Sequence, residues 1–131
     1  MPAKTNSIKY EDWYLHGGRD LQSAKILLKS KGSTENIAFF LQQAAEKYLK
    51  GYLIKQGWKL KKIHDLEVLL SEASRHNESF KAYLDSARLM SAAYIESRYP
   101  LGPPKEYSIE LVSEWLEQTE TLIALIKIET K

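Results

Sequence analysis

The sequence predicts an all-α domain, an up-and-down bundle of about five helices that spans residues 1–131. Apolar residues recur every three or four positions along most of the chain, which is the spacing of one helix face. No segment shows the alternation of apolar and polar residues that is typical of a strand. Proline and glycine lie between the periodic segments, so short connections join the helices and favour antiparallel neighbours.

The first predicted helix covers about Ile8–Ser30, with an inward face of Trp13, Gly17, Leu21, Ala24 and Leu28. The second begins after a cap at Ser33 or Thr34 and is the clearest, because strong helix formers fill its interior. It ends before Gly57, which can adopt the left-handed conformation that terminates helices. Its inward face carries Ile37, Phe40, Leu41, Ala44, Tyr48, Leu49, Tyr52 and Leu53.

A loop over residues 58–63 precedes a short third helix, which Asp65 favours as an acid near the first turn. This helix ends at residues 75–77. A fourth helix follows and stops at residues 100–104, because three prolines and a glycine cannot continue it. The last helix covers about Ser108–Ile128. Inward positions are Leu66, Leu69, Leu70 and Ala73 on the third helix, Phe80, Leu84, Ala87, Ser91, Tyr94 and Ile95 on the fourth, and Ile109, Val112, Leu116, Ile123 and Ile126 on the last.

The composition excludes several kinds of site. The chain has no cysteine, so it has no disulfide and no thiolate nucleophile. His16, His64 and His76 are too scattered to predict a metal site, and no glycine-rich phosphate loop is present. No apolar run approaches the roughly 20 residues that span a bilayer, and the first residues are polar. We therefore expect a cytoplasmic protein with no metal, no cofactor, no catalytic residue set and no membrane partner.

One stretch, Tyr94–Pro100, combines groups that can bind a nucleotide. The guanidinium of Arg98 can hold a phosphate through two parallel hydrogen bonds, and the ring of Tyr94 or Tyr99 can stack on a base. In the alternative interpretation Arg98 pairs with a carboxylate such as Glu96, and the two tyrosines pack in the core. Both interpretations fit the sequence.

Lysines and tyrosines give two further candidates. Lys55, Lys59, Lys61 and Lys62 precede His64 and could contact phosphates, or they could form a solvated loop that Trp58 anchors. The net charge of +2 neither requires nor excludes a nucleic-acid partner. Two tyrosines one turn apart on the second helix, Tyr48 and Tyr52, could line a dimer interface or pack in the core.

These segments together resemble the HEPN domain family over nearly the whole chain. The run from Phe39 to Leu53 is similar to the second-helix signature of the family, His64-Asp65-Leu66 to the opening of its third helix, and Tyr94–Pro100 to the end of its fourth. The resemblance implies a bundle of about five helices, usually dimeric. Members are often encoded beside a minimal nucleotidyltransferase in a two-component system of toxin–antitoxin type.

Some HEPN proteins are metal-independent ribonucleases that use an arginine and a histidine a few residues further on, and others bind nucleotides. Here no histidine follows Arg98. The resemblance therefore predicts a homodimeric, nucleotide-binding partner of a nucleotidyltransferase, with a non-catalytic interaction module or a ribonuclease of degenerate motif as alternatives. The candidate nucleotide-binding residues are Arg98, Tyr99, Tyr94, Lys105 and Lys50.

Overall fold

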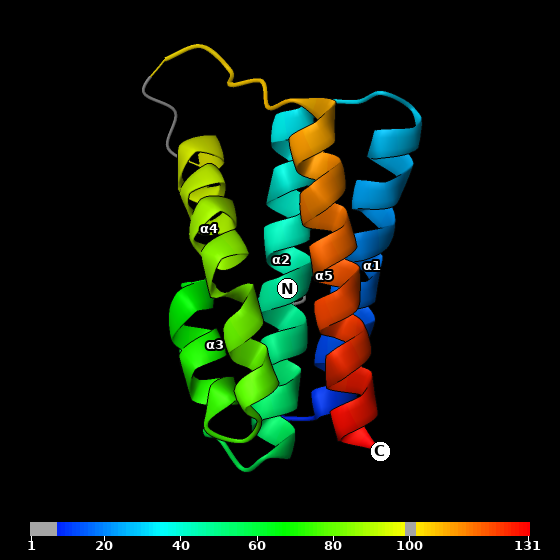
Figure 1. The fold of residues 1–131 in the computed structure, drawn as a ribbon. Coiled ribbons are helices and arrows are strands. Elements are labelled where there is room, and N and C mark those ends of the chain that lie inside the picture. Colours follow the sequence, from blue (N-terminus) through cyan, green and yellow to red (C-terminus); the bar gives the residue numbers. More distant parts are fainter. Residues whose placement is uncertain (1–7, 99–101) are drawn as a thin grey trace.

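Four long helices alternate in direction in the computed structural model, which describes residues 8–98 and 102–131 but not the side chains of 96–98 (Figure 1). The short helix α3 and the 3₁₀ helix η1 lie between the second and third of them in the chain. No strand occurs in the described ranges, so the predicted all-α bundle is confirmed. The elements are α1 (Tyr10–Lys29), α2 (Thr34–Lys55), α3 (Leu66–Ser74), η1 (Glu78–Tyr83), α4 (Leu84–Arg98) and α5 (Ile109–Thr130).

The helix α2 is the centre of the bundle, because it contacts α1, α3, α4 and α5. These neighbours cover it on most sides, so it buries more than the predicted apolar stripe. Three polar residues at four-residue intervals, Gln42, Glu46 and Lys50, are also buried, at 0%, 4% and 3% exposure. Buried polar groups require hydrogen-bond partners, and these three residues find theirs in one another and in His64.

Both predicted ends of α2 are confirmed. The side chain of Ser33 caps the first turn by accepting a hydrogen bond from a backbone N–H three residues later. At the other end Gly57 has a φ of 93°, and its N–H donates to the carbonyl of Ile54 at 2.9 Å. The N–H of Trp58 donates to the carbonyl of Leu53, also at 2.9 Å. This pair of bonds closes the helix and turns the chain back alongside it.

The predicted fourth helix is wrong at its start, since the chain forms η1 before α4 begins at Leu84. The side chain of Asn77 accepts a hydrogen bond from the N–H of Ser79, and the N–H of Phe80 donates to the carbonyl of Asn77. That three-residue spacing belongs to the tighter 3₁₀ helix. It places the Phe80 ring in the core, fully buried.

Two predicted inward positions are exposed. Ile95 is 57% exposed, whereas the buried face of α4 carries Ala87, Met90 and Ala93. Ile95 follows Ala93 by two residues and so lies about 200° further around the helix, which turns it away from the core. Ile109 is 48% exposed because it opens the first turn of α5, at the end of the bundle. Ser91 and Leu116 are half-buried. On α5 the buried set also includes residues that were not predicted from the sequence, Trp115, Thr119 and Leu122.

Tyr48 and Tyr52 pack in the core of the bundle, with 5% and 1% exposure, which is the second of the two predicted interpretations. The Tyr48 ring stacks on that of Tyr14 at a centroid distance of 5.2 Å. Gly17 makes room for this stack, since a Cβ there would lie 2.7 Å from the ring of Tyr48. Burial raises the pKa of Tyr14 to about 12, and its hydroxyl lies 2.7 Å from Oγ1 of Thr130. These tyrosines therefore stay neutral packing groups near neutral pH.

Candidate functional site

One end of the bundle brings together the end of α4, the first turns of α2 and the segment that leads into α5 (Figure 1). Here the ring of Tyr94 on α4 stacks on that of Phe39 on α2, with centroids 5.7 Å apart and planes at 11°. Phe40 meets Phe39 edge to face at 5.4 Å. Tyr94 and Phe39 are both half-buried, so part of this aromatic pair is open to solvent.

The segment over residues 102–107 crosses to the same end of α2. The N–H of Lys105 donates to a carboxylate oxygen of Glu35 at 3.2 Å, and the N–H of Tyr107 donates to Oγ1 of Thr34 at 2.9 Å. Glu35 and Phe39 are four residues apart on α2, so they lie on the same face one turn apart. The structure thus places Lys105 and Tyr94 next to adjacent turns of one helix.

Arg98 is the last residue of α4 and lies one helical turn after Tyr94. Its side chain lies outside the described part of the structure, as does the whole of Tyr99. Of the five predicted residues, the structure therefore brings the positions of Tyr94, Arg98 and Lys105 to one end of the bundle.

Lys50 lies apart from this group, in the interior of the bundle and near the opposite end of α2. Its ammonium is 2.9 Å from Oε2 of Glu46 and 5.6 Å from the ring centroid of Trp13. Because Lys50 is only 3% exposed, a phosphate could reach it only by opening the core. Lys50 is therefore not part of the group of candidate residues at the end of α4.

The carboxylate of Glu46 is the centre of a buried polar network. It accepts hydrogen bonds from Nζ of Lys50 at 2.9 Å and from Nε2 of Gln42 at 3.3 Å, and it lies 3.0 Å from Nδ1 of His64. In the histidine tautomer with a proton on Nδ1, this nitrogen donates to the carboxylate. Nε2 of Gln42 also donates to the carbonyl of His64 at 3.1 Å. The network fastens the chain just before α3 to the middle of α2.

This network was not predicted from the sequence. Gln42, Glu46 and Lys50 recur at intervals of four residues inside a helix that is otherwise apolar, which is a signal of a polar row on one buried face. Whether such a row faces solvent or the core depends on which helices cover it. Their arrangement is a property of the tertiary structure.

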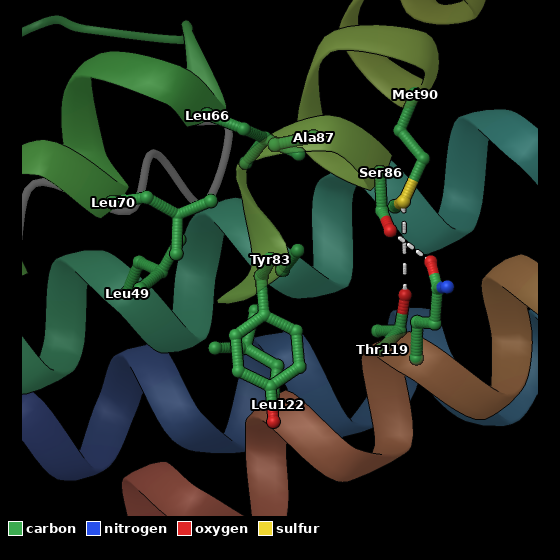
Figure 2. A pocket seen from close by; sticks show the side chains of 11 residues that line it. Leu49, Leu66, Leu70, Tyr83, Ser86, Ala87, Met90, Thr119 and Leu122 are labelled. Carbon is green, nitrogen blue, oxygen red and sulfur yellow. Dashed lines mark hydrogen bonds between the residues drawn. The ribbon is translucent and has the colours of Figure 1, made fainter. Parts of the chain in front are cut away.

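A pocket lies between α2, α3, η1, α4 and α5 (Figure 2). This pocket is too small for a nucleotide. Its volume is about 20 Å³, which is room for about one water, whereas ligand pockets usually exceed roughly 300 Å³. Ser86 donates a hydrogen bond to Gln118, and Thr119 lies 3.9 Å from the sulfur of Met90. Apolar side chains make up the rest of its wall, including Leu49, Leu66, Leu70, Ala87 and Leu122.

The described residues show neither a metal site nor a membrane span. No group of three or more acidic or histidine side chains within residues 8–95 and 102–131 is arranged to hold a metal ion. None of the helices in the described part of the chain is long and apolar enough to cross a bilayer.

Two comparisons with known proteins indicate the same family. The model of the HEPN domain matches residues 10–129. The crystal structure of ST0689, an archaeal HEPN homologue, is 30% identical, covers 94% of this chain and 98% of its own, and superposes with a TM-score of 0.76. The crystal structure of TT1696 from Thermus thermophilus is 24% identical over 90% of this chain and 95% of that one, with a TM-score of 0.78, and supports the fold alone. No curated protein matches.

Proposed function

The chain belongs to the HEPN domain family, and we propose that it binds a nucleotide at the end of α4 as the partner subunit of a minimal nucleotidyltransferase. The stacked pair of Tyr94 and Phe39, one helical turn before Arg98, is the observation that carries this proposal. A half-exposed aromatic pair offers a surface on which a base can stack. The nucleotidyltransferase partner, in a system of toxin–antitoxin type, rests on the family alone.

Each remaining group has a role in this site. Arg98 would hold a phosphate through its guanidinium, and Lys105, which is exposed, would add positive charge. Tyr94, or Tyr99 just beyond the helix, would contact the base or the ribose. The carboxylate of Glu35 accepts from the backbone of Lys105 and so holds the crossing segment near α2.

Arg98→Ala should weaken nucleotide binding by about 10- to 100-fold, because a charge-assisted pair with a phosphate contributes roughly 1.5–3 kcal/mol. Calorimetric titration with ATP and GTP measures this. The matched control is Arg75→Ala, which removes a guanidinium that is 77% exposed at the end of α3 and should leave affinity unchanged.

Three outcomes would contradict the nucleotide proposal. One is no detectable binding at millimolar nucleotide, with or without the partner. Another is unchanged affinity with reduced stability in Arg98→Ala, which would make Arg98 a structural residue. The third is efficient cleavage of RNA by the purified protein, abolished by Arg98→Ala, which would indicate a ribonuclease.

A second candidate function, a dimerisation or interaction module, is favoured by the outer face of α4. Leu89 and Ile95 are 56% and 57% exposed, and Ala92 between them is also exposed. Residues three apart lie on one side of a helix, so these three form an apolar stripe next to Tyr94. A second copy of the chain would cover this stripe in a homodimer.

Leu89→Glu/Ile95→Glu should convert the dimer into a monomer at micromolar concentration, because charged groups at an apolar interface lose their water without gaining partners. Light scattering coupled to gel filtration measures the mass. The control, Leu15→Glu/Ile26→Glu, alters two apolar residues of α1 that are 68% and 58% exposed and should remain dimeric. A wild-type monomer would count against the homodimer.

A further inference from the structure

The segment after α2 is the most basic part of the chain. Residues 55–64 contain Lys55, Lys59, Lys61 and Lys62, together with His64, and no carboxylate. The formal charge of these lysines exceeds the net charge of +2 for the whole protein, so the remaining residues are net acidic. The segment is therefore a local positive feature on a protein that is otherwise slightly negative.

This segment is held in place by defined contacts at both ends. It starts at the closing turn of α2, where the N–H of Trp58 bonds to the carbonyl of Leu53 at 2.9 Å. It ends where Gln42 and Glu46 hold the backbone carbonyl and the ring of His64. Between these points the chain runs back along α2 for about 20 Å, since Gln42 lies some fourteen residues before the end of that helix.

Elsewhere in the described part of the chain, cations commonly meet carboxylates. Lys25 pairs with Glu120 at 2.9 Å, Lys47 with Asp20 at 2.6 Å, and an arginine of α4 pairs with a glutamate of α3. Within residues 8–95 and 102–131, no such pair involves the four lysines of the segment. In this part of the chain, their positive charge is therefore not offset by a carboxylate in an ion pair.

Two of the lysines meet aromatic rings in place of acids. Nζ of Lys55 lies 4.9 Å from the ring centroid of Tyr10, and Nζ of Lys61 lies 5.9 Å from that of Trp58. Both rings are half-buried, and Lys59 and Lys62 are exposed. Unneutralised cations beside partly open rings are the combination that binds the phosphates and bases of a nucleic-acid strand.

We propose that this lysine strip, Lys55, Lys59, Lys61 and Lys62, binds the phosphodiester backbone of a single-stranded nucleic acid. The ammonium groups would neutralise successive phosphates, and Tyr10 or Trp58 would offer a ring edge to a base. Because the segment is already fastened to α2, little further ordering is needed on binding. The strip begins at the end of α2, and Arg98 lies at the opposite end of the bundle, so this is a second site (Figure 1).

The test measures binding of fluorescent oligouridylate and oligothymidylate by anisotropy at several salt concentrations. Lys59→Ala/Lys61→Ala/Lys62→Ala should lower affinity about tenfold or more and reduce the salt slope by about 2, since each lost phosphate contact on a single strand contributes roughly 0.7. Lys29→Ala/Lys81→Ala/Lys131→Ala makes the same change in net charge at exposed lysines outside the strip and should stay within about twofold of wild type. The two oligomers distinguish RNA from DNA.

Two results would overturn the proposal. If both triple variants lose affinity equally, the binding depends on net charge and not on the strip. If the wild-type protein binds neither oligomer at low salt, there is no nucleic-acid site of this kind.

Discussion

Glu46→Leu should lower the free energy of unfolding by about 3–5 kcal/mol, because it leaves the ammonium of Lys50 buried without a counter-charge. Lys50 is 3% exposed and is held at 2.9 Å from the Glu46 carboxylate. Leucine has a similar volume, so the loss comes from the polar network and not from a cavity. Gln42 and His64 lose the same acceptor. Urea denaturation followed by circular dichroism gives the value.

The matched control for this substitution is Glu120→Leu. Glu120 pairs with Lys25 at the same distance of 2.9 Å, but both side chains are about half exposed, so the expected loss is below about 1 kcal/mol. Adding Lys50→Met to Glu46→Leu should recover a large part of the stability, since the unpaired charge is then gone. A loss under about 1 kcal/mol for Glu46→Leu alone would show that water reaches Lys50 after all.

Phe80→Ala should cost about 3–5 kcal/mol, which is the usual range when a buried aromatic ring leaves a cavity. Phe80 is fully buried on η1, and its ring centroid lies 5.0 Å from that of Tyr52 on α2. Since domains of this size unfold with roughly 5–15 kcal/mol, the loss is a large share of the total. Urea denaturation at constant temperature measures it.

The neighbouring substitution Lys81→Ala is the control for Phe80→Ala. Lys81 is exposed and lies 3.7 Å from the exposed Glu78, so a change within about 0.5 kcal/mol is expected. If Phe80→Ala were equally mild, η1 would contribute little to the core. The short connection between α3 and α4 would then be a loosely attached element and not part of the bundle.

Three of the five candidate nucleotide-binding residues lie at one end of the bundle, but the aromatic neighbour of Tyr94 was not among the candidates. Arg98, Tyr94 and Lys105 could be named because guanidinium, phenol and ammonium groups cluster near a helix end and a proline-rich connection. Phe39 was not named, although its ring is the one on which Tyr94 stacks. Lys50 was named for its charge alone, and the packing of α1 over α2 is what buries it. Charge is a property of one residue, whereas accessibility depends on its neighbours.

Helix number, order and most helix ends were determined by the sequence itself, because the signals that set them are local. A glycine with a positive φ, a capping serine and apolar spacing of three or four residues act within one or two turns. The start of α4 and the exposure of Ile95 were not determined by such local signals. They depend on how Asn77 turns the chain and on which face of α4 meets α2.

Only the tertiary structure decided that α2 is covered on most sides. This covering places Glu46 in the core, and the contact of Glu46 with His64 ties the lysine strip to α2. Long-range packing is set by all helices together, and no single segment encodes it.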